Sequence, residues 1–346
     1  MRTAFTVVRW ARSKSLRDSI LFGSSEFMRC RRLPIGAAVV LLAAFLGSCK
    51  PAHEDRGEVR VAYLQIIPSL PVFVAQEQGL FEKENLRLKA IALSSSNDLV
   101  NAMVAGQADI LPATSLVPII HLEIQSPGRV RIFSHSRMND SNSLDKIIVK
   151  DSSPLHTIDG LRGKKIGVFP GTAPSHMLAA FFKKHGVDPA TISMVQLPPP
   201  AQISSLESGA VDALFAYEPV TTTALVQGGY RQLFGSVYAD LLNPCPIGAS
   251  VISREFERSH PQVAAGAVRA LQKAVDYMSA HPAESRALLS KYIRLSPEVA
   301  ARVNVADVTL SNQVDVANLQ QFIDLLYQTG EIPERIDAHR LVDPTR

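Results

Sequence analysis

The sequence predicts an α/β protein with two similar lobes, because one pattern of strands and helices occurs twice. Each copy contains a Gly-x-x-Asp step that ends an amphipathic helix and precedes a short apolar strand. This step runs from Gly106 to Asp109 in the first copy and from Gly209 to Asp212 in the second. Each copy also begins with a strand-like run and a proline-marked turn. The repetition favours two matched lobes, each a mostly parallel sheet flanked by helices, with a cleft between them.

The first copy is expected to contain three strands separated by two helices. Its expected elements are a strand at Val59–Tyr63, a helix at Val72–Gln78, a strand at Leu86–Ala92, a helix ending at Gly106 and a strand after Asp109. Pro71 is well placed to begin the first helix, since the N–H that proline lacks is unpaired there. Gly79 suits the left-handed residue that ends this helix.

The second copy repeats this order. Its expected elements are a strand at Lys165–Phe169, a helix at about Pro174–His185, a strand at Ile192–Leu197, a helix ending at Gly209 and a strand after Asp212. Thr172 or Ala173 is expected to cap the first helix, because they come directly before Pro174. Gly186 is expected to end it.

Ligands of such sheets bind beyond the carboxyl ends of the strands, so the loops that follow the strands are the predicted site. These loops are Gln65–Ser69, Ser94–Ser96, Thr114–Ser115, Pro170–Ala173 and Tyr217–Glu218. Within them, the candidate ligand-binding residues are Gln65, Ser69, Ser95, Ser96, Thr114, Ser115, Gly171, Thr172, Ala173, Tyr217 and Glu218. The repeated glycines and aspartates themselves are expected to be structural, because helix ends and turns explain them.

Two of the loops offer hydrogen-bond donors. The segment from Gly171 to Ala173 opens a helix, where free backbone N–H groups and the helix dipole attract an anion. A plain helix start is the alternative. Thr114 and Ser115 offer hydroxyls, and the alternative for them is to cap the helix expected at Leu116–Glu123.

The loop at the end of the second repeat offers an acid and an aromatic ring. Glu218 has two open roles, as a partner for a ligand's amine or ring N–H and as a cap for the next helix. Tyr217 is the better candidate for stacking on a flat ligand, because Phe215 lies in the middle of the strand and is expected in the core.

The N-terminal segment explains the basic charge of the chain, which is +4 overall. Residues 1–48 hold eight Lys and Arg against two Asp and Glu, so 28 basic and 30 acidic residues remain from Cys49 onward. The charged run from Met28 to Arg32 and the apolar stretch Ile35–Leu46 are typical of an export signal, with Met28 as a possible true start. A nucleic-acid-binding role is not predicted, because the folded part has no basic run.

Cysteine and histidine patterns indicate no metal or cofactor. The nine histidines are scattered without ligand spacing, and the chain lacks the short motifs of nucleophilic or phosphate-binding sites. Cys245 has no partner in the exported part and is expected to be a small packed residue.

The motifs together resemble the periplasmic substrate-binding proteins of ABC importers, in the nitrate, sulfonate, taurine and thiamine-precursor group. The resemblance spans roughly residues 58–290. It rests on Pro71–Leu86, Ala102–Asp109, Leu161–Val168, Leu206–Ala213, Glu218–Pro219 and Ala280–Glu284. The sequence Leu46-Gly-Ser-Cys49 also resembles a bacterial lipoprotein signal, in which Cys49 is lipidated and 49–57 is a tether.

The resemblance implies a type II periplasmic-binding-protein fold that closes on its ligand and whose chain crosses between the lobes twice. Lobe one is expected at 58–147 plus 249–346, with helices at Pro261–Ser279, Pro282–Tyr292 and Val314–Gln328, and lobe two at 152–243. The implied protein is a monomer outside the cytoplasm, anchored to a membrane by lipid, which delivers a small solute to an ABC permease with its ATPase. It is not expected to be an enzyme.

The ligand is expected to be a small organic molecule, such as a sulfonate or a heterocyclic vitamin precursor. The site loops contain no arginine, whereas a doubly charged oxyanion usually requires arginine forks. Two alternatives stay open: an enzyme of the same fold acting on a pyrimidine or quinone precursor, and a ligand-sensing lipoprotein.

Overall fold

The computed structural model describes residues 57–343. The predicted export signal, Cys49 and the tether up to residue 56 lie outside this range. Within it, no helix has both the length and the apolar character that crossing a bilayer requires.

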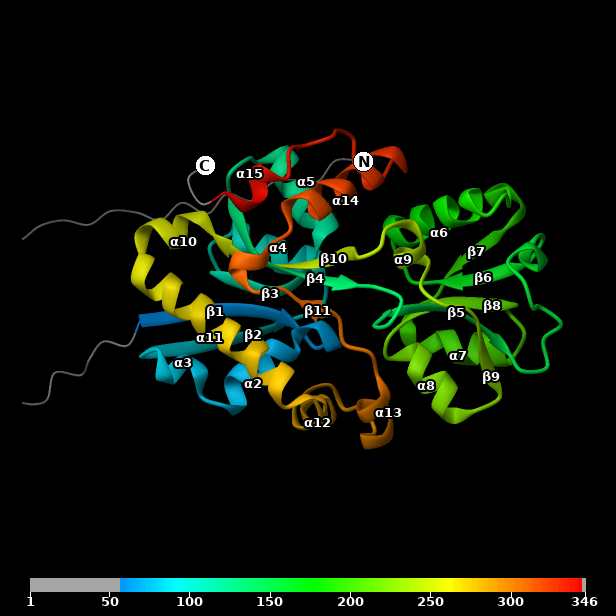
Figure 1. Cartoon of the computed structure of the whole chain (residues 1–346), viewed down its shortest axis with the longest axis horizontal. Helices are drawn as coiled ribbons and strands as arrows, with labels where there is room; N and C mark the ends of the chain where they lie inside the picture. Colours follow the sequence, from blue (N-terminus) through cyan, green and yellow to red (C-terminus); the bar gives the residue numbers. More distant parts are fainter. Residues whose placement is uncertain (1–56, 344–346) are drawn as a thin grey trace, which may run out of the picture. The chain divides into compact units, whose positions relative to one another are not determined.

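The first sheet has six strands in the order β11-β4-β10-β3-β1-β2 (Figure 1). Its strands are β1 (Gly57–Leu64), β2 (Leu86–Leu93), β3 (Ile110–Ser115), β4 (Val130–Met138), β10 (Cys245–Ser253) and β11 (Asp307–Val308). Strand β1 runs parallel to β2 and β3, as the repeat predicts. The remaining pairs are antiparallel.

The second sheet has five strands in the order β7-β6-β8-β5-β9. They are β5 (Asp145–Lys150), β6 (Lys165–Val168), β7 (Ser193–Gln196), β8 (Ala213–Tyr217) and β9 (Tyr230–Phe234). Strand β6 is parallel to β7 and β8, whereas β5 is antiparallel to β8 and β9.

The two sheets share one strand order. The series β2-β1-β3-β10 in the first sheet corresponds to β7-β6-β8-β5 in the second. In each series the first three strands are the predicted parallel unit, and the fourth is an antiparallel strand that arrives from the other lobe. The predicted two-lobed α/β fold is confirmed, and the parallel part of each sheet is limited to these three strands.

Two connections join the sheets. Strand β5 belongs entirely to the second sheet, so the first connection is residues 139–144 rather than the segment after 147. The second connection is residues 242–244, between α9 and β10. The side-chain amide of Asn243 donates to a carboxylate oxygen of Asp140 at 2.9 Å, which ties the two connections together.

Helices cover both faces of the first sheet, because side chains of each strand alternate between two cores. Along β1, Val59, Val61 and Tyr63 enter one core, and Ala62 and Leu64 enter the other. The first core is covered by α2 (Leu70–Glu77), α3 (Leu80–Lys83), α10 (Arg254–Ser259), α11 (Pro261–Ala280), α12 (Pro282–Ile293) and α13 (Pro297–Arg302). The other is covered by α4 (Ser96–Val104), α5 (Leu116–Gln125), α14 (Val316–Gln328) and α15 (His339–Val342).

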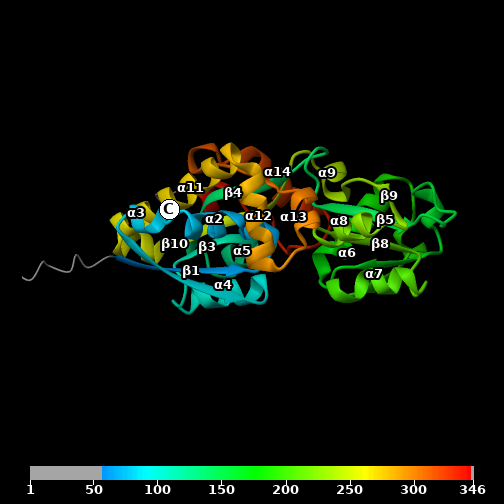
Figure 2. The same cartoon turned by 90° about the horizontal axis from the view of Figure 1, so that it is seen from below.

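The second sheet is covered in the same manner, with α6 and α9 on one face and α7 and α8 on the other (Figure 1). These helices are α6 (Thr172–Lys184), α7 (Pro199–Glu207), α8 (Val220–Gln227) and α9 (Val237–Leu241). Figures 1 and 2 both place α13 beside α8, and Val226 of α8 packs against the core that contains Val299 of α13.

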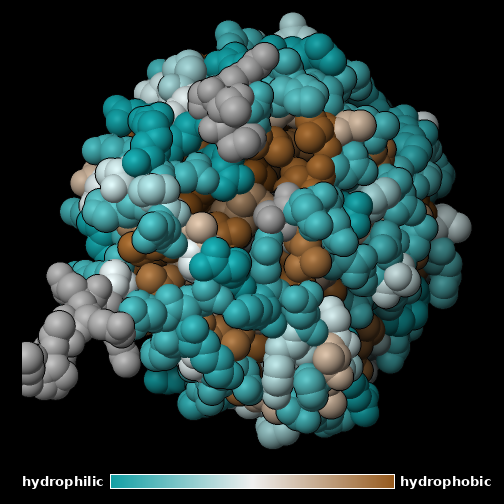
Figure 3. Space-filling model, turned by 60° about the vertical axis from the view of Figure 1, so that its left-hand side comes forward, coloured by the Kyte–Doolittle hydropathy of each residue, from teal (hydrophilic) through white to brown (hydrophobic). Residues whose placement is uncertain are grey.

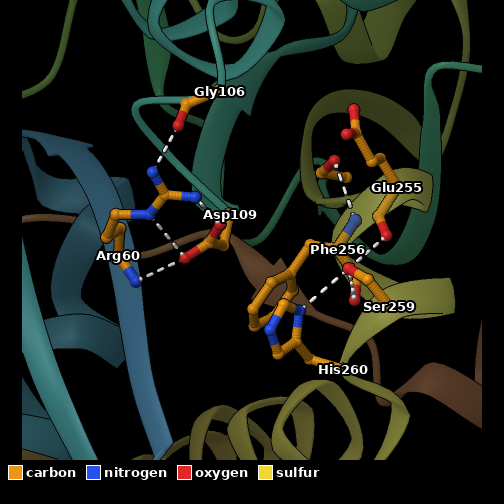
Figure 4. A network of polar contacts seen from close by, with 8 residues as sticks. Arg60, Gly106, Asp109, Glu255, Phe256, Ser259 and His260 are labelled. Carbon is orange, nitrogen blue, oxygen red and sulfur yellow. Dashed lines mark hydrogen bonds and ion pairs between the residues drawn. The ribbon is translucent and has the colours of Figure 1, made fainter.

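Each repeated aspartate fastens its strand to the first strand of its own sheet. The carboxylate of Asp109 accepts the backbone N–H of Arg60 at 2.8 Å, and its own N–H donates to the Arg60 carbonyl at 2.8 Å. The Arg60 guanidinium also binds this carboxylate and the Gly106 carbonyl (Figure 4). Asp212 makes the same two backbone bonds to Lys165, both at 2.8 Å. The aspartates are therefore structural, as expected.

Hydrophilic residues cover most of the face shown in Figure 3. Among the described residues, the large hydrophobic side chains that are exposed are Ile66, Val104, Phe169, Leu225 and Tyr327. Phe169 directly follows β6, and Ile66 lies two residues after the end of β1.

Candidate functional site

The lobe-one candidates from the second and third strands meet at the ends of β2 and β3. The backbone N–H of Ser115 donates to the hydroxyl of Ser96 at 3.4 Å. Ser95 caps α4, since its hydroxyl accepts the N–H of Asp98 at 3.1 Å. Ser115 is the residue before α5, but its side chain makes no capping bond, so its hydroxyl is not committed to the helix.

Two further lobe-one candidates are buried hydroxyls without a hydrogen-bond partner. Ser69 is 0% exposed and Thr114 is 3% exposed, and neither side-chain oxygen has a partner among the described residues. Buried polar atoms are nearly always paired, so such exceptions gather at strained or ligand-binding positions. Gln65 is exposed, and its amide approaches the Tyr292 carbonyl at 3.5 Å, which is a weak contact.

In lobe two, the predicted anion-binding loop begins α6. Gly171, and not Thr172 or Ala173, is the N-cap of this helix. Its φ of +127° suits glycine, which explains why the cap falls there. No side chain caps α6 from its own N-terminus, so the donors of the first turn are available to another partner.

A carboxylate that no sequence pattern predicted, that of Glu331 in the segment after α14, binds two side chains at the start of α6. One carboxylate oxygen accepts the Thr172 hydroxyl at 2.9 Å, and the other lies 2.7 Å from Nδ1 of His176. The Glu331 side chain is only 5% exposed. Thr172 and His176 are four residues apart and share one face of the helix. The contact joins an element of lobe one to an element of lobe two. No local sequence pattern predicts it.

An aromatic cluster adjoins this loop. Phe169 meets Tyr217 edge to face with ring centroids 5.9 Å apart, and the hydroxyls of Tyr217 and Tyr238 lie 3.2 Å apart. Burial, together with the neighbouring Tyr238, holds the pKa of Tyr217 well above its usual value, and burial also raises the pKa of Tyr238, so both hydroxyls stay protonated. Phe215 is fully buried, as expected. The structure thus brings Tyr217 to the Gly171 loop, and it adds Phe169 and Tyr238.

Glu218 has internal partners instead. Its carboxylate accepts the backbone N–H of Thr222 at 3.2 Å and the Thr222 hydroxyl at 2.8 Å, and Lys146 lies 3.6 Å away. The carboxylate is 2% exposed. Of the two roles open to Glu218, the structure shows the capping of α8.

The described residues contain no group of three or more His, Cys, Asp or Glu side chains arranged to hold a metal ion. Cys245 is fully buried, and burial raises the pKa of its thiol well above the usual value. It is a packed residue, as predicted.

Two sheets of matched strand order, joined by two connections and carrying polar loops at their strand ends, define the fold of the periplasmic binding proteins. The chain belongs to the NMT1-like family, whose model matches residues 52–294. The predicted family is therefore confirmed.

Similar proteins agree with this assignment. The "Putative aliphatic sulfonates-binding protein" of Bacillus subtilis is 26% identical over 317 residues, which cover 89% of this chain and 93% of that protein. The crystal structure of the periplasmic aliphatic sulphonate binding protein SsuA from Escherichia coli superposes with a TM-score of 0.70 at 22% identity, covering 83% of this chain and 97% of SsuA.

The fold also occurs in an enzyme. The structure of the desulfurization enzyme DszB matches with a TM-score of 0.63 at 15% identity, covering 84% of this chain and 97% of DszB. At this identity the likeness concerns the fold alone.

Proposed function

We propose that this protein is the solute-binding receptor of an ABC import system and that it captures a small organic anion with a sulfonate-like head. The head group binds at the first turn of α6, and the lobe-one hydroxyls of Ser96, Thr114 and Ser115 close over the solute from the other side. The receptor then delivers the solute to a membrane permease. The "Putative aliphatic sulfonates-binding protein" of Bacillus subtilis, matched over 93% of its length, supports this role.

The observation that carries the proposal is that the start of α6 already binds a carboxylate of the chain itself. Glu331 is bound there by the hydroxyl of Thr172 and the ring of His176. The backbone N–H groups of a helix start and the helix dipole favour negative charge at this place. A site that seats a carboxylate has the donors that a singly charged sulfonate or carboxylate requires.

The neighbouring side chains favour an organic anion over an inorganic one. Phe169 is 39% exposed beside Tyr217, which gives apolar surface for a short alkyl chain or a ring. The loops contribute hydroxyls and backbone N–H groups but no arginine fork, which fits a singly charged head group.

We further propose that the protein is exported and acts as a monomer, anchored through Cys49 outside the cytoplasm. The lipoprotein-like sequence before Cys49 supports this location, and the Escherichia coli sulphonate-binding relative is periplasmic. The protein acts by binding rather than by catalysis in this proposal.

A thermal-shift screen tests the proposed ligand class. A ligand that binds only the folded state raises the melting temperature by mass action. We expect short alkanesulfonates to raise it at millimolar concentration and sodium nitrate to leave it unchanged. Stabilisation by nitrate but by no organic anion would contradict the proposal. Turnover of a stabilising compound, followed by chromatography, would instead indicate an enzyme.

A further inference from the structure

Glu331 is held firmly at the α6 turn from the lobe-one side. Its backbone N–H donates to the Leu326 carbonyl at 2.9 Å, which fixes it to the end of α14. The next residue, Ile332, is 2% exposed and belongs to the core that α14 covers. The position of the carboxylate is therefore fixed by a packed segment of lobe one.

The same carboxylate occupies two side-chain donors at the start of α6, beside the N–H groups to which the proposed ligand is assigned. Both of its oxygens are engaged, one by Thr172 and one by His176. A second anion at this turn would lie within a few ångströms of Glu331 in a partly buried place, where like charges repel strongly. The anionic head of a ligand and the Glu331 carboxylate thus exclude one another.

We infer that Glu331 is an internal competitor of the ligand. In the empty receptor it occupies the anion-binding turn of α6 and links the two lobes, and it leaves when the head group of the ligand binds. This inference rests on the proposed function, because it assigns the ligand's head group to the same turn. It makes Glu331 a residue that sets both affinity and the charge of accepted ligands.

Replacing Glu331 by glutamine tests the competitor role. Glutamine keeps the shape and one acceptor but removes the charge, so the bond to His176 weakens and repulsion of the ligand disappears. The matched control is Glu334→Gln, an exposed glutamate three residues further along the chain. We expect Glu331→Gln to tighten the binding of butanesulfonate by about tenfold in calorimetry, the size typical of one charge-assisted bond. Glu334→Gln should bind like the unaltered protein.

A second measurement, made without ligand, tests whether Glu331 links the two lobes through its contacts with α6. Amide hydrogen exchange in the first turns of α6 should be faster in Glu331→Gln than in Glu334→Gln. Unchanged exchange would overturn the link, whatever the ligand does. Faster exchange with weaker butanesulfonate binding would overturn the competitor role, because it would place the Glu331 contacts in the bound state.

The two measurements also separate this inference from the proposed ligand class. Binding by Glu331→Gln where the unaltered protein shows none would support competition. If neither protein binds butanesulfonate or any other short alkanesulfonate, the ligand class and the competitor role both fail, and the exchange result still decides whether Glu331 links the lobes.

Discussion

The carboxylate of Asp212 accepts the backbone N–H of Lys165 at 2.8 Å, while the N–H of Asp212 donates to the Lys165 carbonyl at the same distance. Asp109 and Arg60 make the same pair of bonds in the other lobe. The repeat seen in the sequence is therefore a repeated fastening between the first and third parallel strands. It fixes where each third strand begins beside the first strand, since β3 starts at Ile110 and β8 at Ala213.

The two aspartates should differ in their importance for stability. Asp109 is 2% exposed and also binds the Arg60 guanidinium, whereas Asp212 is exposed. Asp109→Ala leaves a buried N–H and a cation without their partner, so we expect it to lower the free energy of unfolding by about 2–4 kcal/mol. Asp212→Ala should cost about 1 kcal/mol. Urea titration compares them, and equal losses would contradict this account.

The conformation of Gly171 and its role in binding can be separated by two substitutions. Gly171→Ala tests the strain of a side chain at φ +127° and should cost about 1–2 kcal/mol of stability. Gly171→Asp adds a negative charge at the anion-binding turn. We expect it to abolish binding of alkanesulfonates while melting close to Gly171→Ala, and equal affinities in the two variants would remove this loop from the site.

The contribution of Asp145 to stability should be lost as the pH rises. Its carboxylate is fully buried and accepts the Ser236 hydroxyl and the Val237 N–H, both at 2.6 Å. Burial raises its pKa to about 6. Because this exceeds the value of about 4 for an unfolded aspartate, the folded state holds the proton more tightly. The resulting stability is present below about pH 4 and is lost as pH rises through about 6.

The comparison with Asp145→Asn isolates this effect, because asparagine does not titrate. Between pH 4 and pH 7, the free energy of unfolding of the unaltered protein should decrease relative to that of Asp145→Asn, by up to about 3 kcal/mol. Parallel stability curves over this interval would show that the carboxyl group is not perturbed.

Phe169 should contribute to the affinity for longer alkyl chains. Phe169→Ala removes exposed apolar surface beside Tyr217, so the gain in affinity from ethanesulfonate to butanesulfonate should shrink severalfold. Val104→Ala is the control, since Val104 is 46% exposed at the end of α4 away from the strand-end loops. An undiminished chain-length dependence in Phe169→Ala would exclude this contact.

The elements of the two repeats were predictable because their signals are local. The proline at the start of α2 and the glycines after α2 and α6 mark those helix limits directly, and Gly79 and Gly186 have the expected positive φ of +58° and +71°. The cap of α6 was displaced to Gly171, because residue type alone did not reveal that its backbone is left-handed there.

The sheet to which β5 belongs could not be predicted from the local sequence. Asp145 to Val149 are all buried, a pattern that identifies a strand but not the sheet that it joins. The choice depends on pairing with β8 and β9, which lie more than sixty residues away in the chain. The predicted boundary at 147 consequently divided this strand.

About half of the proposed site could be predicted from the sequence. The strand-end loops follow from topology, and they include Thr172 and Tyr217. Glu331 was missed because its partners lie 155 and 159 residues away and nothing around it resembles a motif. Glu218 looked available because its partners Thr222 and Lys146 are brought to it only by the fold.

Calorimetric titration of the purified protein with butanesulfonate shows whether the α6 turn receives an organic anion. We expect one ligand bound per chain, with binding heat that disappears in Gly171→Asp and affinity that increases in Glu331→Gln. Absence of binding heat for butanesulfonate and its shorter homologues, or equal binding by Gly171→Asp, would contradict the claim that the α6 turn receives an organic anion.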